Sequence, residues 1–397
     1  MPVMQSPPGP ETVIDGRRYL YFSGTGYLGL QGHPEVIRAA CRATEQYGIG
    51  SATSRGGYGD TPPILEAERQ AARLFGTETS FYFMSGYVGN DVLARSIADE
   101  VDAVFVDECA HYCVQEAAQR LAKPLHRFHH ADPGDLAEKL RSHAPPGARP
   151  LVMSDGVFAA LGTIAPAAEY CEILRAYPGS SLVIDDAHGL GVLGQNGRGT
   201  LEHAGLFGKR GRSSFSQDDC PDPAETSRKR AASPFSVPDN PRLFLCGTLS
   251  KALGGYGGII PGSAAAIERI ESASHYFAGA SPVPVPIAAA SARALQLAID
   301  QPELRTQLWE NVAAIRSGLR EMGVEVPDTP APIISLALGT TEHMERIHRA
   351  LADRGILIPY KRTYSGLGPE GALRLAVFAT HTADMIARLL DELRRLI

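Results

Sequence analysis

A lysine set among small residues is the first part of this chain that could do chemistry. Lys251 lies in the stretch GTLSKALGGYGG (247–258), which contains five glycines. Small neighbours can keep water away from the amine, and a desolvated lysine amine is a good nucleophile that forms Schiff bases with carbonyl groups. Glycines allow the backbone to approach a bound molecule closely. Taken alone, the stretch fits a surface turn equally well, so other residues must decide between the two interpretations.

A carboxylate and a histidine follow another predicted strand. The apolar run SLVIDD (181–186) continues into Ala187 and His188, so Asp185 and Asp186 stand at the end of the strand. Ligands of parallel sheets gather at the carboxyl ends of strands. A buried carboxylate there can hold a heterocyclic nitrogen in its protonated form. The alternative is a capping aspartate beside a structural histidine.

The glycines that come next match the GxGxxG pattern of dinucleotide-binding proteins, at Gly189, Gly191 and Gly194. That fingerprint follows its strand directly and opens a helix. Here DDAH intervenes, and the glycines lead into QNGRG, which does not begin a helix. The sequence therefore argues against a nicotinamide cofactor.

Two further strand ends carry polar groups. The turn MSGYVGND (84–91) precedes helix-forming residues, and backbone N–H groups at a helix start, with Ser85 beside them, make a natural phosphate cradle. The stretch DECAHYCVQEAA (107–118) places His111 just past another strand, where a histidine can stack on a flat ring or carry a proton. For this histidine too, a structural role is the alternative.

The elements that must position these residues alternate between helix and strand, which predicts a layered α/β fold. Apolar residues at helical spacing predict helices at 35–48 and 62–76. Short apolar runs predict buried parallel strands at 80–84, 103–107, 150–155, 181–186 and 242–247. After PVPVP (282–286) come a helix at 287–300, a strand near PIISLALG (332–339) and a helix at 383–397. We expect an N-terminal segment (1–45), a large domain with a mainly parallel sheet (46–286) and a small C-terminal α+β domain (287–397).

Composition narrows the function classes. The net charge of the 397 residues is −6 with no long basic tract, which argues against a nucleic-acid partner. No apolar stretch fits a signal sequence or a membrane helix, and the six cysteines form no CxxC pair, so we expect a cytoplasmic protein with reduced thiols. The histidines at 126, 129 and 130 have no carboxylate or cysteine at helical ligand spacing, so no metal is predicted.

One stretch does not fit the alternation of helix and strand. Residues 213–240 are rich in Ser, Pro, Asp and Arg, and they predict a flexible inserted loop at the surface. A solvated insertion is the simplest interpretation. A lid, or a docking site for an anionic substrate or an acidic carrier protein, is the alternative.

The combination of these motifs resembles one enzyme family. Phosphate turn, histidine, DDAH and lysine occur in the order SGYVGN, DECAHYCVQEAA, IDDAHGLGVLGQNGRG, GTLSKALGGYGG, with YLYFSGTGYLGLQGHP before them and ALRLAVFATHT after them. This arrangement is similar to that of the α-oxoamine synthases, which are fold-type I enzymes dependent on pyridoxal 5′-phosphate (PLP). The resemblance covers nearly the whole chain. It implies a homodimer in which both subunits contribute to each active site.

The resemblance also implies roles for individual residues. Lys251 would bind the cofactor covalently, Asp185 would pair with its ring nitrogen, His188 with its phenolic oxygen, and His111 would stack on the ring. The remaining implied positions are the phosphate-binding Ser85, Gly86, Tyr87, Thr248 and, from the neighbouring subunit, Ser281, and on the substrate side Arg374, for the α-carboxylate, and Thr25.

The implied reaction is a decarboxylative condensation of an amino acid with an acyl thioester, giving an α-amino ketone. Several positions depart from the family pattern. Ala159 replaces a hydroxyl residue, Leu161 and Thr163 replace two acidic residues, and Thr25 replaces an asparagine. Another PLP reaction, namely transamination, decarboxylation or aldol cleavage, is therefore the alternative, and a non-catalytic homologue is a third hypothesis. Lys361 and Arg362, in IPYKRTYSGLG (358–368), are candidates for contact with an anionic substrate.

Overall fold

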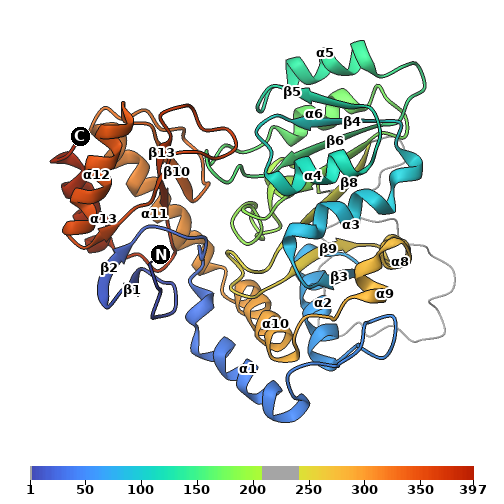
Figure 1. Cartoon of the computed structure of the whole chain (residues 1–397), viewed down its shortest axis with the longest axis horizontal. Helices are drawn as coiled ribbons and strands as arrows, with labels where there is room; N and C mark the ends of the chain where they lie inside the picture. Colours follow the sequence, from blue (N-terminus) through green and yellow to red (C-terminus); the bar gives the residue numbers. More distant parts are fainter. Residues whose placement is uncertain (1, 208–240) are drawn as a thin grey trace.

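A seven-stranded sheet forms the centre of the computed structural model, which describes residues 2–207 and 241–397 (Figure 1). The strand order is β3-β9-β8-β7-β6-β4-β5, and β8, β7, β6, β4 and β5 run parallel to one another. The bounds are β3 Thr79–Phe83, β4 Ala103–Asp107, β5 Leu125–Phe128, β6 Pro150–Asp155, β7 Ser181–Asp185, β8 Arg242–Thr248 and β9 Gly258–Gly262. The predicted α/β fold with a mainly parallel central sheet is confirmed.

The sheet differs from the prediction at one edge. The run at 80–84 was expected to be a parallel strand, but β3 pairs antiparallel with β9, and β9 pairs antiparallel with β8. Strand β9, with the sequence GIIPG, has too many glycine and proline residues to be recognised from propensity. It is nevertheless fully buried, because α-helices cover both faces of the sheet.

Three helices of this part begin in the connections that follow β3, β4 and β7, namely α3 Gly89–Ser96, α4 Tyr112–Arg120 and α7 Thr200–His203. The others are α1 Pro34–Tyr47, α2 Pro62–Phe75, α5 Pro133–His143, α6 Ala167–Leu174, α8 Ala264–Ala273 and α9 His275–Gly279, with short 3₁₀ turns η1 Leu30–Gly32, η2 Gly86–Val88 and η3 Ala98–Glu100. The helices predicted at 35–48 and 62–76 are confirmed as α1 and α2.

The C-terminal part adds two small sheets and four helices. Strand β2 (Arg17–Tyr21) pairs with β1 (Glu11–Ile14) on one side and with β11 (Ile356–Leu357) on the other, and β10 (Ile333–Leu336), β13 (Ala372–Ala376) and β12 (Tyr360–Lys361) form the second sheet. The helices are α10 Val285–Asp300, α11 Glu303–Glu321, α12 Thr341–Asp353 and α13 Ala383–Arg394. The predicted boundary near residue 286 falls at the start of α10, which packs against α1 and α2. The division at 45 and 286 stays a prediction.

The topology brings distant segments to one edge of the large sheet. Strand β3 runs in the same direction as β8, because both are antiparallel to β9. The carboxyl ends of β3, β4, β6, β7 and β8 therefore lie at the same edge, which faces the N-terminal and C-terminal sheets (Figure 1). Ligands of open α/β sheets bind at such an edge. Among the helices of the described residues, none is both long enough and apolar enough to cross a lipid bilayer. The predicted loop at 213–240 lies outside the described residues.

Candidate active site

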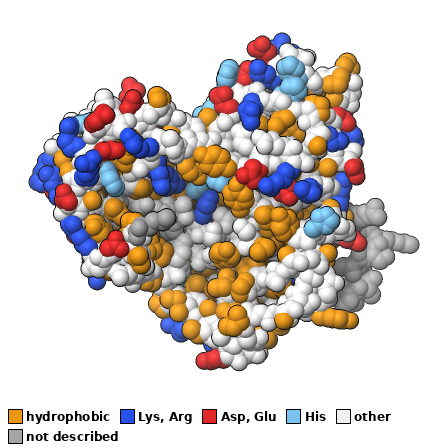
Figure 2. Space-filling view, in the orientation of Figure 1, with side chains coloured by type: hydrophobic (Ala, Val, Ile, Leu, Met, Phe, Trp, Pro, Cys, Tyr) orange, Lys and Arg blue, Asp and Glu red, His pale blue; other side chains and the backbone are white. Residues whose placement is uncertain are grey.

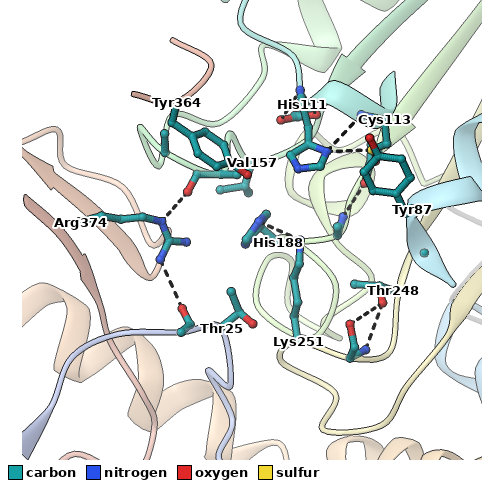
Figure 3. Close-up of a pocket in the computed structure, with 18 of the residues that line it drawn as sticks. Thr25, Tyr87, His111, Cys113, Val157, His188, Thr248, Lys251, Tyr364 and Arg374 are labelled. Carbon is teal, nitrogen blue, oxygen red and sulfur yellow. Dashed lines mark hydrogen bonds between the residues drawn. The ribbon is translucent and has the colours of Figure 1, made fainter. Parts of the chain in front are cut away.

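A cavity of about 500 Å³ opens at the carboxyl ends of the strands (Figure 3). Nearly all the residues implied by the sequence line it: Thr25, Ser85, Gly86, Tyr87, His111, Asp185, His188, Thr248, Lys251 and Arg374. The exception is Ser281, which is exposed in the loop between α9 and α10 and is not among the lining residues.

The amine of Lys251 contacts His188 inside the cavity. Lys251 lies in the loop after β8, and its Nζ is 2.9 Å from Nε2 of His188, which follows β7. Burial lowers the pKa of Lys251, and the negative charges of Asp185 and Asp155 oppose this effect. Burial also lowers the pKa of His188 well below its usual value, with the positive charge of Lys251 acting in the same direction. The amine thus has more nucleophilic character than an exposed lysine at neutral pH.

The carboxylate of Asp185 is held by three donors. Its Oδ2 accepts hydrogen bonds from Asn90 Nδ2 at 2.5 Å and from the Cys113 thiol at 3.3 Å, and its Oδ1 accepts one from the Ala187 N–H at 3.1 Å. The side chain is buried, yet it lines the cavity. Burial raises the pKa of Cys113, so this thiol is protonated and donates to the carboxylate.

A hydroxyl-rich corner lies where η2 meets the end of β8. Ser85 caps η2 by accepting the Tyr87 N–H, and the Thr248 and Ser250 hydroxyls lie 2.8 Å apart. A Cβ on Gly86 would come within 2.6 Å of the Thr248 Cβ, so only glycine fits here. The corner thus brings hydroxyl groups and the start of a helix close together, which is the donor set that a phosphate group needs.

His111 presents its ring between the two sides of the cavity. Its backbone N–H donates to the carboxylate of Asp155 at 3.1 and 3.2 Å, and its Nδ1 accepts the Cys113 N–H, which caps α4. The ring lies 6.0 Å from that of Tyr87 and 6.2 Å from that of Tyr364. Burial lowers the pKa of His111, and the charge of Asp185 opposes this effect. The ring is therefore mostly neutral at pH 7.

Arg374 enters the cavity from β13, on the opposite side (Figure 3). Its Nε donates to the carbonyl oxygen of Ala159 at 2.6 Å, and another guanidinium nitrogen donates to that of Gly24 at 3.3 Å. These contacts fix a cation near Thr25. Of the two basic residues on β12 and just after it, Lys361 lines the cavity, whereas Arg362 is directed toward Glu345.

The sequence did not reveal several residues of the site. Asn90 and Cys113 were within quoted motifs, at the starts of α3 and α4, but only the fold shows that both reach Asp185. Asp155 ends β6, so the strand-end argument applied to PLVMSD would have found it. Tyr364 lies in the quoted stretch IPYKRTYSGLG (358–368), where attention went to Lys361 and Arg362 instead. Of the histidine trio, His126 stacks on His143 and His129 is exposed, both outside the cavity.

The cavity therefore holds a nucleophilic amine, a buried carboxylate, and a hydroxyl corner at a helix start. These groups suit a molecule that combines a carbonyl, a basic ring nitrogen and a phosphate. A neutral imidazole and a fixed guanidinium complete the lining, and the guanidinium suits a carboxylate.

Comparison with known proteins identifies a matching family and several similar enzymes. The pattern of the family described as aminotransferase class I and II matches residues 20–393. The 8-amino-7-oxononanoate synthase of Cellvibrio japonicus (strain Ueda107) is 32% identical over 391 residues, which cover 98% of this chain and 90% of that protein. A putative 8-amino-7-oxononanoate synthase of Desulfovibrio desulfuricans (strain ATCC 27774 / DSM 6949 / MB) is 33% identical over 393 residues, covering 99% and 93%.

One solved structure superposes on the full length of this chain. A variant of serine palmitoyltransferase from S. paucimobilis with a bound PLP–myriocin aldimine superposes with a TM-score of 0.86 and 25% identity, and the match covers 100% of this chain and 92% of that one. The activities named for these proteins are those of α-oxoamine synthases, so the resemblance and the fold type inferred from the sequence are confirmed. The chain belongs to the aminotransferase class I and II family.

Proposed function

We propose that this protein is a PLP-dependent acyltransferase that condenses an amino acid with an acyl thioester. Carbon dioxide leaves the amino acid, the carbon–sulfur bond of the thioester breaks, a carbon–carbon bond forms, and the products are an α-amino ketone and a free thiol. The observation that carries the proposal is the Lys251 amine, placed 2.9 Å from His188 in a cavity that also holds Asp185. The family and the named relatives support the same conclusion.

The residues of the cavity fit the cofactor. The Lys251 amine would attach it, Asp185 would pair with the ring nitrogen, and the corner where Gly86 packs against Thr248, too closely for a Cβ, would bind the phosphate. The complete set that would hold it is Lys251, Asp185, His188, His111, Ser85, Gly86, Tyr87 and Thr248. When bound, PLP supplies an electron sink that stabilises negative charge on the carbon next to the amino group.

The protein side chains then bind the substrate and move its protons. Arg374 binds the α-carboxylate of the amino acid through the N–H groups that its contacts with Ala159 and Gly24 leave free, and Thr25 lies beside it. The Lys251 Nζ, which lines the cavity, would take the α-proton and return one later. His188 Nε2 lies next to that amine and keeps it within the cavity.

The proposal includes a homodimer. Large apolar side chains are exposed on α1, on the segment after it and at the start of α10, a region that is rich in apolar groups in Figure 2: Ile37, Tyr47, Ile49, Tyr58 and Ile287. Tyr58 is 96% exposed, which is unusual for tyrosine and favours an interface. Ser281 lies in the loop that leads into α10, and α10 begins with a hydrogen bond from Val285 to Ile49. In a dimer joined through this surface, Ser281 would reach the phosphate of the neighbouring subunit.

A cytoplasmic location is also part of the proposal. The five cysteines within the described residues are all free thiols, which suits a reducing compartment.

A substrate panel tests the proposed reaction. The holoenzyme is incubated with single amino acids, with and without an acyl-CoA, and both carbon dioxide and free thiol are measured. Release of the two in equal amounts, only when both substrates are present, is the expected result. Lys251→Ala should lose the activity, and Lys139→Ala, a lysine on α5 away from the cavity, should retain it.

The same panel separates the alternative reactions. Ala159 provides no side-chain hydroxyl to the cavity, which is the reason to consider a different PLP reaction. Formation of a keto acid without thiol release would replace the acyltransferase with an aminotransferase, and carbon dioxide without thiol would indicate a decarboxylase.

A further inference from the structure

Three buried or half-buried side chains form a hydrogen-bonded chain that the sequence did not reveal. The Tyr27 hydroxyl lies 2.7 Å from His188 Nδ1, and His188 Nε2 lies 2.9 Å from Lys251 Nζ. Tyr27 is fully buried and His188 is 6% exposed, so water does not compete for the contact between them. Nδ1 of His188 thus contacts a phenol hydroxyl, and Nε2 contacts an amine.

The surroundings decide which way the Tyr27 proton points. Burial raises the pKa of Tyr27 to about 12, so the phenol keeps its proton at neutral pH. The positive charge of the nearby Arg374 guanidinium acts on the same oxygen, and a guanidinium offers donors but no acceptor. The guanidinium cannot accept the phenol proton, which leaves Nδ1 of His188, 2.7 Å from the hydroxyl, as its acceptor.

The state of the histidine ring follows from this donation. Burial and the nearby positive charge of Lys251 lower the pKa of His188 well below its usual value, so the ring is neutral and carries one proton. A ring nitrogen that accepts a hydrogen bond carries no proton. We propose that Tyr27 is a positioning residue that fixes the tautomer of His188, with the ring proton on Nε2 and facing Lys251 and the cavity.

The tautomer of His188 affects the protonation state of the Lys251 amine. An Nε2–H group donates to the lone pair of a neutral Lys251 amine, whereas a bare Nε2 would accept from the ammonium form and stabilise it. Tyr27 thus favours the neutral, reactive form of the Lys251 amine, although it contacts His188 and not the lysine itself. The other ionisable groups that act on the two side chains are Asp185 on β7, Asp155 on β6, His111 and Cys113 at α4, and Arg374 on β13. A Tyr27→Phe change leaves all of these in place.

The contact also joins two parts of the fold. Tyr27 follows β2, and its carbonyl oxygen accepts the Ala379 N–H at 2.7 Å, after β13. His188 and Lys251 belong to loops of the large sheet. Gln31, four residues after Tyr27, donates from its side-chain amide to the Lys251 carbonyl oxygen at 2.5 Å. The N-terminal segment therefore contacts the loop that carries Lys251 in two ways. Gln31 binds the backbone of Lys251, and Tyr27 acts on the Lys251 amine through His188.

The test uses the apoenzyme, so it needs neither cofactor nor substrate. The pH dependence of Lys251 acetylation by limiting acetic anhydride, followed by mass spectrometry, gives the pKa of its amine. Tyr27→Phe should raise that pKa by about one pH unit, the size of one hydrogen bond. Tyr82→Phe is the matched control, because Tyr82 is also buried, its hydroxyl bonds to Tyr256 and Ser291, and it does not line the cavity. An unchanged or lower pKa in Tyr27→Phe would overturn the proposal.

A second measurement needs no variant at position 27. In wild-type apoenzyme labelled with ¹⁵N-histidine, with the His188 signals identified by their loss in His188→Gln, Nε2 should carry the proton and Nδ1 should not. The reverse assignment would overturn the proposal. The catalytic consequence rests on the proposed function: Tyr27→Phe in the holoenzyme should lower kcat about tenfold while KM for the amino acid changes little. If the condensation fails but both apoenzyme results hold, only the proposed function is wrong.

Discussion

The side-chain amide of Asn90 donates a hydrogen bond to Asp185, with Nδ2 2.5 Å from Oδ2. Asn90 lies in the first turn of α3 and Asp185 ends β7, so the bond ties the helix start to the centre of the sheet. Both side chains are buried, and the oxygen of the Asn90 amide is itself bonded to the Cys246 thiol at 3.2 Å. The amide is thereby oriented, and it holds the carboxylate toward the cavity.

Removing that amide should weaken cofactor binding. In Asn90→Ala, Asp185 loses its closest donor, and a hydrogen bond to a charged group contributes about 1.5–3 kcal/mol. We expect the Kd for PLP, measured by equilibrium dialysis of the apoenzyme, to rise at least tenfold. Asn196→Ala is the control, because this exposed residue bonds to Glu202 away from the cavity. Equal Kd values for both variants would show that Asp185 does not depend on Asn90.

Arg374 should determine the affinity for the amino acid. The Arg374→Ala enzyme loses a fixed guanidinium, so KM for the amino acid should rise roughly 10- to 100-fold, as expected for one charged contact. Arg374→Lys keeps the positive charge but lacks the planar guanidinium fork, so its KM should lie between those of the wild type and Arg374→Ala. Arg362→Ala, whose guanidinium is directed toward Glu345, is the control. If KM were unchanged in Arg374→Ala, another group would bind the carboxylate.

His381 should make the protein less stable in acid. Burial lowers its pKa to about 4, and the ring is held between the Phe378 N–H, which it accepts, and the Tyr21 carbonyl, with Phe22 stacked at 4.1 Å. The folded-state pKa is below the unfolded value of about 6.5, so the unfolded chain binds the proton first, and stability falls as the pH decreases from about 6.5 to about 4.

The size of this effect follows from the two pKa values. Between pH 7 and pH 5 the His381 contribution decreases by about 2 kcal/mol. In His381→Gln this part of the pH dependence should vanish, so the difference in melting temperature between the variant and wild type should become smaller at pH 5 than at pH 7. A difference that stays constant over this range would contradict the buried neutral state of His381.

The sequence predicted the parts of the site that are defined by local order along the chain. Ser85, His111, Asp185 and Lys251 each follow an apolar run, and parallel strands bring such ends together. Contacts between distant segments could not be predicted from the sequence: Tyr27 and His188 are 161 residues apart, and Asn90 and Asp185 are 95 residues apart. These pairs depend on how helices and loops pack on the sheet, which periodicity does not encode.

The fold shows the same limit. Strands with β-branched runs, such as β7, were predicted within a residue of their bounds, because burial on both faces selects for them. Strand β9 was missed, since its stability comes from packing between β3 and β8 rather than from its own residues.

The proposed function requires that PLP is attached to the Lys251 amine. Reduction of the holoenzyme with borohydride, followed by proteolysis and mass spectrometry, tests it most directly, because the reduced link is stable and marks one residue. A pyridoxyl-phosphate mass is expected on the peptide that contains Lys251, with no label in Lys251→Ala. A label on any other lysine, or its persistence in Lys251→Ala, would show that Lys251 does not bind the cofactor.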